Sequence, residues 1–300
     1  MANKIRLGID LGGTKIEIIA LDEQGAVLFN QRVNTPRGEY QGTLQAIGEL
    51  IAQAETQLQQ PASIGVGMPG SFSPGSGKVR NANSTWLNGQ AFDKDLQNHL
   101  GREVRFANDA NCLALSEAVD GAGAGCHSVF AIIIGTGVGG GLAFDGKVHH
   151  GLNGLGGEWG HNPLPWLEKQ AYPGPDCYCG KQGCIETFIS GTGFTQDYLR
   201  HTGKALTGEE IMAAFDDGEP EARECFARYQ KRLAHAIASV ANILDPDVFI
   251  LGGGMSNITH LYDHLPGLIE TVIFGGEFKT PIRPAKHGDA SGVRGAAWLW

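Results

Sequence analysis

The chain has 300 residues, of which 42% are hydrophobic and 18% charged, and its formal net charge is −9. This acidic balance argues against a nucleic-acid surface, which needs clustered Lys and Arg, and no apolar run approaches the roughly 20 residues of a membrane span. The opening residues MANKIRLGID lack the basic, apolar and cleavage regions of a signal peptide, so a cytoplasmic protein without disulfides is expected. This length favours two domains of ordinary size.

Strand and helix patterns alternate along the chain as in an α/β protein. Strands are expected over 5–9, 16–21 and 26–33, followed by a helix over 40–59 and the buried strand SIGVGMPG. The strand EVRFAND then leads into the helix ANCLALSEAVDG, with Asn108 and Asp109 where helix N-caps occur. Further on, EEIMAAFDDG and the segment from AREC to ILDP predict helices, and DVFILGGGMS predicts a buried strand. The tail GVRGAAWLW predicts a short helix that packs back on the first domain.

The opening pattern returns near residue 129. The stretch VFAIIIGTGVGGGLAFDGKVHHG repeats the order strand, Gly-Thr turn, strand of IRLGIDLGGTKIEIIALDEQGAVL, and Thr14 and Thr136 occupy matching places. A duplication at this separation predicts two similarly built α/β domains. The first is expected over residues 1–120, with a returning C-terminal helix at 285–300. The second and larger one is expected over residues 121–284 and carries a cysteine-rich loop.

Three glycine-rich loops are candidates for holding a nucleotide. The loop LGGTK departs from P-loop spacing and leads into a strand, so a plain hairpin turn is the alternative, although its amides, hydroxyl and lysine can face phosphate oxygens. The loop GTGVGG matches GxGxxG, but a strand follows it, which argues against a dinucleotide fold. The third loop, GGGM, ends a buried strand and lets backbone approach an adenosine, with a crowded strand-to-helix turn as the alternative. The candidate residues are Asp10, which can hold hydrated magnesium, and Gly12, Gly13, Thr14, Lys15, Gly135, Thr136, Gly137, Gly253, Gly254 and Met255.

The segment CYCGKQGCIE places three cysteines within eight positions. In a reducing compartment this spacing is typical of zinc, and a tetrahedral site needs a fourth ligand. Free thiols in a loop are the alternative, and the spacing is not the CxxC of thioredoxin. By proximity and residue type, the candidate fourth ligands include His149, His150, His161 and Asp176.

The motifs DLGGTK, NDAN, GTGVGGG, GEWGHNPL, CYCGKQGCIE and LGGGMS occur in this order over essentially the whole chain. Together they resemble the ROK family of bacterial sugar kinases and repressors. The resemblance implies a two-domain actin-like, hexokinase-type fold of the ribonuclease H-like kind, which binds ATP with Mg²⁺ and a sugar. ROK repressors carry an additional N-terminal helix-turn-helix, whereas this chain begins at the first glycine hairpin, so we expect a kinase. The family is often dimeric, which leaves a homodimer open here.

The resemblance also implies roles for individual residues. It matches Asp109 to the catalytic base that phosphoryl transfer to a hydroxyl needs, with helix capping as the rival role. It selects His161 as the fourth ligand of a structural zinc site that is completed by Cys177, Cys179 and Cys184. The zinc would fix the two segments that carry Glu158 and Glu186. The ring nitrogen of His161 that does not bind zinc would reach a sugar hydroxyl. The residues implied to contact the sugar are Asn83, Asn108, Asp109, Glu158, His161 and Glu186.

The expected substrate comes from the stretch ANSTWLNGQAFDKDL, whose wording is closest to the family's fructokinases that also accept mannose. We therefore expect transfer of the γ-phosphoryl group of ATP to the 6-hydroxyl of fructose. An N-acetylglucosamine kinase or a glucokinase of the same family is the first alternative. A non-catalytic sugar-sensing protein is the second, and a zinc-bearing structural or redox protein the third. Trp86 in this stretch either closes the sugar site or packs in the core.

Overall fold

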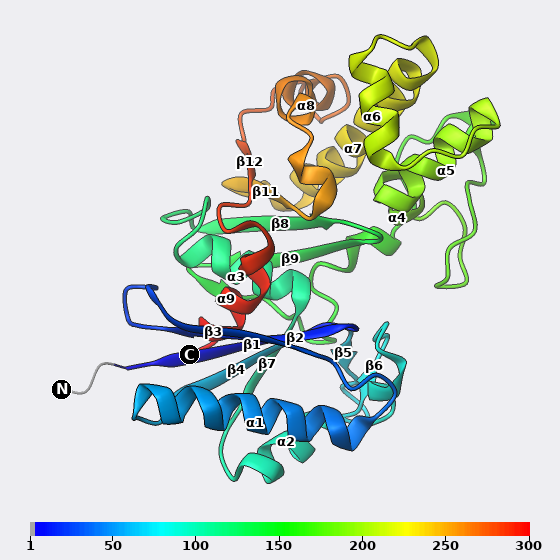
Figure 1. The fold of residues 1–300 in the computed structure, drawn as a ribbon. Coiled ribbons are helices and arrows are strands. Elements are labelled where there is room, and N and C mark those ends of the chain that lie inside the picture. Colours follow the sequence, from blue (N-terminus) through cyan, green and yellow to red (C-terminus); the bar gives the residue numbers. More distant parts are fainter. Residues whose placement is uncertain (1–3) are drawn as a thin grey trace. The chain divides into compact units, whose positions relative to one another are not determined.

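The computed structural model describes residues 4–300, which divide into two compact units (Figure 1). Unit 1 comprises the chain up to His127, together with Gly141–Gly156 and Lys286–Trp300. Unit 2 comprises Ser128–Gly140 and Gly157–Ala285. The predicted domain boundaries differ from these units mainly over residues 141–156, and they stay a prediction. Within residues 4–300, none of the helices is long and apolar enough to cross a membrane.

Unit 1 is built on a five-stranded sheet with helices on both faces (Figure 1). Its strand order is β3-β2-β1-β4-β7, in which the first three strands pair antiparallel and β4 and β7 are added in parallel. The strands are β1 (Arg6–Leu11), β2 (Lys15–Leu21), β3 (Val27–Asn34), β4 (Ser63–Met68) and β7 (Arg105–Asn108). The helices are α1 (Tyr40–Leu58), α2 (Phe92–Leu100), α3 (Asp109–Val119) and α9 (Ser291–Ala297). A small hairpin of β5 (Ser71–Phe72) and β6 (Val79–Arg80) and the 3₁₀ turn η1 (Thr85–Leu87) precede α2.

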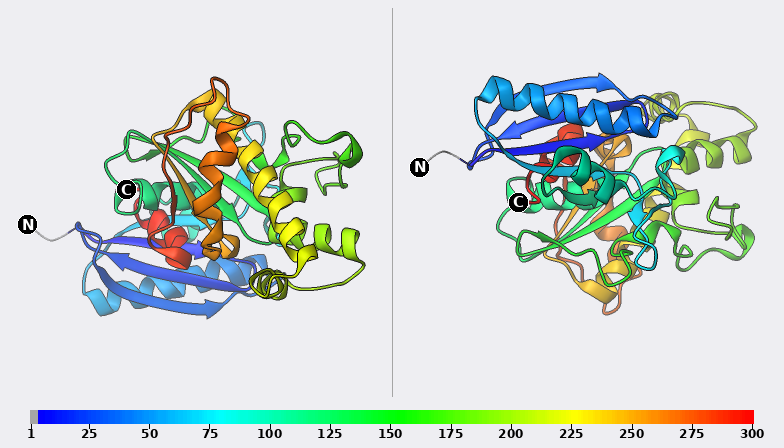
Figure 2. Two further views of the ribbon diagram at one scale, coloured as in Figure 1. Left: turned by 90° about the horizontal axis from the view of Figure 1, so that it is seen from above. Right: turned by 90° about the horizontal axis from the view of Figure 1, so that it is seen from below.

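The sequence pattern explains how this sheet is covered. Helix α1 buries Leu44, Ile47, Leu50, Ile51 and Ala54, which recur at helical spacing, against one face of the sheet, and it runs alongside the strands (Figure 2). The tail helix α9 lies against the other face. A Cβ atom added to Gly8 in β1 would come within 2.1 Å of the Val293 carbonyl oxygen, so only glycine allows α9 to approach this closely.

A second five-stranded sheet has the order β10-β9-β8-β11-β12. The strands β8, β11 and β12 and the start of β9 belong to unit 2, whereas β10 and the rest of β9 fall within Gly141–Gly156 of unit 1. The order repeats that of the first sheet, a hairpin ribbon followed by two parallel strands, as the repeated sequence pattern predicts. The strands are β8 (Ser128–Ile134), β9 (Val138–Phe144), β10 (Lys147–Val148), β11 (Val248–Gly252) and β12 (Ile282–Pro284). The helices are α4 (Glu186–Ile189), α5 (Gly191–Thr202), α6 (Gly208–Asp216), α7 (Pro220–Leu244) and α8 (His260–Glu270). The 3₁₀ turns are η2 (Glu158–His161), η3 (Lys169–Ala171), η4 (Gly254–Asn257) and η5 (Gly288–Ala290), the last of which belongs to unit 1.

Parallel pairing places the candidate residues at one edge of each sheet. In unit 1, β1 ends next to Asp10 and β7 ends at Asn108, with β4 between them. In unit 2, Gly252 at the end of β11 pairs with Ile133 at the end of β8. Ligands of open α/β sheets bind outside the carboxyl ends of such strands, so ligand-binding residues are expected at these two edges.

Candidate functional site

Two carboxylates meet at the carboxyl edge of the unit 1 sheet. Burial raises the pKa of Asp10 to about 7, and the negative charges of Asp109 and Glu17 act in the same direction, while Arg32 opposes them. Burial also raises the pKa of Asp109, although its amide contact to Ala110 lowers it. Solvent still reaches the Asp109 side chain, so it is an accessible carboxylate in surroundings that solvate charge poorly. Oxygen ligands and excess negative charge suit a magnesium ion at Asp10.

Helix capping, the alternative role of Asp109, is carried out by the neighbouring Asn108. The Asn108 side-chain oxygen accepts a hydrogen bond from the Asn111 amide at 2.7 Å and is therefore the N-cap of α3. Asp109 is the first residue of the helix, and its Oδ1 accepts from the adjacent Ala110 amide at 2.8 Å. The capping is thus done by the Asn108 side chain and not by the Asp109 carboxylate.

The first glycine hairpin turns between β1 and β2. The Gly12 amide donates to the Lys15 carbonyl at 3.0 Å, and the Thr35 hydroxyl donates to the Gly12 carbonyl at 2.9 Å. Thr14 and Lys15 are exposed, so their side chains can reach a phosphate. Below the turn lies Ser84, whose buried hydroxyl has no hydrogen-bond partner among residues 4–300. A buried hydroxyl without a protein partner is rare in a folded protein, so this one marks a place where a ligand or an ordered water can bind.

The stretch around Asn83 is mostly occupied with packing. Asn83 itself is exposed, but Leu87 and Phe92 are fully buried in the unit 1 core. Trp86 packs partly buried against the same core and donates its indole N–H to the Thr43 hydroxyl at 3.2 Å. The residue types of this stretch are therefore explained by packing against the core of unit 1, where a tryptophan is usually found.

In unit 2 three segments converge on the end of β8. The turn of Gly135–Gly137 closes with a hydrogen bond from the Gly135 amide to the Gly137 carbonyl at 3.0 Å. The Gly191 amide donates to the Gly135 carbonyl at 2.8 Å. A Cβ atom added to Gly253 would come within 2.6 Å of the Ile134 carbonyl oxygen, so the third glycine loop lies directly against the same strand end. These contacts bring the predicted residues Gly135, Thr136, Gly137, Gly253, Gly254 and Met255 into one region.

The carboxylate of Glu186 joins this region to the cysteine loop. Its Oε2 accepts a hydrogen bond from the Val138 amide, directly after the glycine turn, at 2.9 Å. Glu158 and His161 are the first and last residues of η2. Because residues i and i+3 of a 3₁₀ turn lie on the same side, these two side chains share one face.

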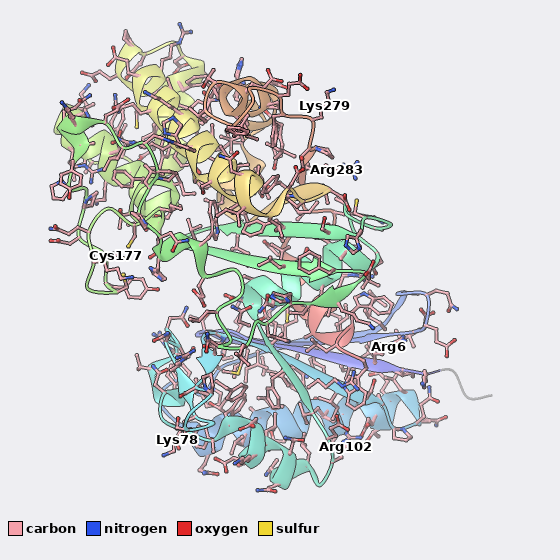
Figure 3. All side chains as sticks on the ribbon, turned by 180° about the vertical axis from the view of Figure 1, so that it is seen from behind. Arg6, Lys78, Arg102, Cys177, Lys279 and Arg283 are labelled. Atoms are coloured by element: carbon pink, nitrogen blue, oxygen red, sulfur yellow. The ribbon has the colours of Figure 1, made fainter. Side chains whose placement is uncertain are left out.

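The cysteine loop forms a compact ligand cluster. The ligand atoms of His161, Cys177, Cys179 and Cys184 all lie within 4.8 Å of one another. The Cys179 and Cys184 sulfurs are 3.6 Å apart, and His161 Nδ1 is 3.5 Å from the Cys177 sulfur. A tetrahedral zinc with Zn–S bonds near 2.3 Å needs sulfurs about 3.8 Å apart, so the cluster fits zinc. Of the four fourth-ligand candidates, His161 is the one within the cluster. Figure 3 labels Cys177 on this loop.

The second ring nitrogen of His161 has a protein partner. Its Nε2 lies 3.0 Å from the Tyr178 hydroxyl, and the two rings meet edge to face with centroids 5.1 Å apart. Burial raises the pKa of Tyr178 to about 12, and the charges of Glu186 and Glu158 add to this. The resemblance to the ROK family implies that this nitrogen reaches a sugar hydroxyl, which stays a prediction.

Sequence reasoning missed several residues of these regions. Ser190 caps α5 by accepting from the Gly193 amide at 2.9 Å, and the Thr192 hydroxyl donates to the Thr136 carbonyl at 2.9 Å. A signal was present, since Gly191-Thr192-Gly193 repeats the GTG of the second hairpin. Ser84 and Tyr178 offered no such signal, because only the fold brings them beside Gly13 and His161.

The duplicated sheet with glycine hairpins at the carboxyl ends defines the actin-like, hexokinase-type ATPase fold. The ROK family profile matches residues 6–300, and the chain belongs to the ROK family. It is 38% identical, over 99% of both chains, to an N-acetyl-D-glucosamine kinase of Pasteurella multocida. It resembles the crystal structure of the ROK hexokinase from Thermus thermophilus, with 29% identity, a TM-score of 0.87 and coverage of 98% of this chain and 97% of that one. It also resembles a ROK family glucokinase from Streptomyces griseus in complex with glucose and AMPPNP, with 28% identity, a TM-score of 0.77 and coverage of 98% of both chains.

These comparisons confirm the predicted family and fold and correct the predicted substrate. The fructokinase expectation is wrong, because several curated relatives that are 38–41% identical over 97–99% of this chain are named N-acetyl-D-glucosamine kinase. The physical reason lies in the stretch from Ala82 to Leu96 on which that expectation relied. Leu87, Phe92 and Leu96 are core residues, and the Asn88 side chain bonds the backbone of Ala82. The residue types of the stretch are thus explained by packing more than by contact with a sugar.

Proposed function

We propose that this chain is an ATP-dependent N-acetyl-D-glucosamine kinase. It transfers the γ-phosphoryl group of ATP to a sugar hydroxyl, with the 6-hydroxyl as the acceptor. The observation that carries the proposal is the name shared by full-length relatives, combined with an Asp109 carboxylate that is not consumed as a helix cap. A non-catalytic sugar sensor, which is the alternative, would need no such carboxylate as a base.

The proposed chemistry assigns each unit a part of the work. Asp109 accepts the proton of the attacking hydroxyl, and its raised pKa makes it a stronger base than an ordinary carboxylate. Asp10 would hold hydrated magnesium, whose charge offsets that of the phosphates. The exposed Thr14 and Lys15 face the phosphates from the first hairpin.

Unit 2 would supply the remaining contacts to both substrates. The backbone of the turn Gly135–Gly137 and the loop Gly253–Met255 would hold the nucleotide, since glycines let a ligand approach the backbone closely. Glu158, His161 and Glu186 would hydrogen-bond the sugar. His161, Cys177, Cys179 and Cys184 would hold zinc as a structural ion, because a site with four protein ligands leaves no position open for catalysis.

The test is a substrate panel with purified protein, ATP and magnesium, in which ADP release is followed with N-acetylglucosamine, glucose, mannose and fructose. We expect the highest kcat/KM with N-acetylglucosamine. A higher kcat/KM with any other sugar would overturn the proposed substrate while leaving the kinase reaction intact. Absence of turnover with every sugar would overturn the kinase itself.

A further inference from the structure

A groove in unit 1 has no part in the function proposed above. Its volume is about 340 Å³, and all nine residues that line it belong to unit 1. They come from the start of β7, from α3, from the segment around β10 and from the two residues after α9. Sites for small molecules have volumes of roughly 300–1,000 Å³, so the groove is large enough for an organic ligand.

The groove is separate from the candidate site at Asp109. Arg105 is the first residue of β7 and Asn108 is the last, so the groove lies at the amino end of that strand. Leu115, which also lines the groove, follows Asp109 by six residues on α3. At a rise of about 1.5 Å per residue, this is about 9 Å along the helix axis. A ligand in the groove would therefore leave the carboxyl edge of the sheet free.

The walls of the groove are held by close packing. Helix α9 lies so close to α3 that a Cβ atom added to Gly295 would come within 1.8 Å of the Cys112 carbonyl oxygen (Figure 1). At the end of the tail, the Trp300 indole N–H donates to the Ile64 carbonyl at 2.7 Å. Because these contacts fix the walls, binding in the groove requires little ordering of the protein.

The tail also orients the guanidinium of Arg105. Its NH1 donates to the Leu299 carbonyl at 2.7 Å, and its central carbon lies 3.8 Å from the centroid of the Trp300 ring. The contact of Arg105 with Glu103 is 3.8 Å long and joins two exposed side chains, and pairs of this kind are weak. A guanidinium has five N–H donors, and the bond to Leu299 uses one of them. Arg105 is thus a positioned cation with donors left for a ligand.

The other polar groups of the groove are mainly donors as well. The side chains of Lys147 and His150 are exposed, and no hydrogen bond or ion pair joins either side chain to another of residues 4–300. The buried indole N–H of Trp298 also lacks a partner within this range. None of the nine lining residues is acidic, and the Asp145 carboxylate beside Gly146 pairs with His127 at 2.7 Å. In a chain with a formal net charge of −9, such a group of donors favours an anion.

We propose that this groove binds a small organic phosphate monoester. Its phosphoryl group is bound by Arg105 and Lys147, because a guanidinium matches the geometry of phosphate oxygens and an ammonium adds a second positive charge for a dianion. Its organic part lies on the apolar walls, which Phe106, Trp298 and Leu299 provide. A groove of this size has room for more than the phosphoryl group alone.

The test is isothermal titration calorimetry of the full chain with phenyl phosphate, in the absence of ATP and sugar. Inorganic phosphate and benzoate are titrated for comparison, since the first lacks the ring and the second lacks the phosphoryl group. We expect phenyl phosphate to bind more tightly than either. Lys147→Ala should raise the Kd of phenyl phosphate about tenfold, as for the loss of one hydrogen bond to a charged group. Lys78→Ala is the matched control, since Lys78 is another exposed lysine of unit 1 and lies outside the groove, and its Kd should equal that of the wild type.

A further variant, Lys15→Ala, separates the groove from the first glycine hairpin, where a phosphate is also expected. If Lys15→Ala abolishes the binding of phenyl phosphate, the probe binds at the hairpin and the proposal is wrong. The proposal is also wrong if millimolar phenyl phosphate does not bind, if Lys147→Ala leaves its Kd unchanged, or if benzoate or inorganic phosphate binds as tightly. None of these results depends on turnover, so failure of the proposed kinase function would be seen separately, in the substrate panel.

Discussion

The two glycine hairpins share one backbone device and differ in what surrounds it. Each closes with a hydrogen bond within the turn, from Gly12 to Lys15 in unit 1 and from Gly135 to Gly137 in unit 2. The first hairpin carries charged residues on both strands. Asp10 in β1 lies opposite Glu17 in β2, and Lys15 is the first residue of β2. The second has no charged residue in its turn and is held by the Glu186 carboxylate at Val138. Duplication thus preserved the turn, and the neighbouring segments gave each copy its own chemistry.

The largest effect is expected from replacing Asp109, the proposed base in unit 1. Asp109→Asn should keep the fold and sugar binding but lower kcat about 10²- to 10⁴-fold, because an amide cannot accept the proton. Steady-state kinetics with ATP and N-acetylglucosamine measure this. Thermal unfolding is the control, and the variant should be at least as stable, since it removes a carboxylate whose charge is poorly solvated in the folded state.

The pH profile sharpens the same assignment. A base works only when deprotonated, so kcat should fall as the pH falls through the pKa of Asp109. Because this pKa is raised, the acid limb should lie above the range of an ordinary aspartate. A kcat of Asp109→Asn close to the wild-type value would remove Asp109 from this role.

A second and smaller effect should separate the proposed sugar contacts of unit 2 from its proposed nucleotide contacts. Removing zinc with a chelator, or replacing Cys179 with alanine, should raise the sugar KM on the order of tenfold and more than the ATP KM. The reason is that the cluster holds His161 directly and Glu186 two residues after Cys184. Zinc content and both KM values are measured together. Unchanged sugar affinity in zinc-free enzyme would reduce the cluster to a local support of the loop.

The smallest effect contrasts one glycine from each hairpin. A Cβ atom at Gly137 would lie 2.6 Å from Oε2 of Glu186, whereas one at Gly13 meets only the Ser84 hydroxyl at an ordinary 3.5 Å. Gly137→Ala should therefore displace Glu186 and raise both the ATP KM and the sugar KM about fivefold. Gly13→Ala should change either KM less than about twofold. Equal effects of the two substitutions would contradict the difference between the hairpins.

The sequence predicted best where neighbouring residues decide the structure. The strands β1, β2 and β3, helix α1 and the long helix α7 are confirmed close to their predicted bounds, because their apolar periodicity is local. The duplication was visible for the same reason, as was the cysteine spacing. The substrate was predicted wrongly, because a sequence stretch cannot reveal whether Trp86 faces a ligand or the Thr43 hydroxyl.

By itself, the sequence determined the family, the two hairpins and the three clustered cysteines, since each depends on residue types at short spacing. Tertiary structure alone decided that Asn108 caps α3 and leaves Asp109 open, that Glu186 meets the Val138 amide, and that Tyr178 bonds His161. Glu186 and Val138 lie 48 residues apart in the chain, and Tyr178 and His161 lie 17 residues apart. Contacts at such separations depend on how strands and loops are packed, and no local pattern encodes them.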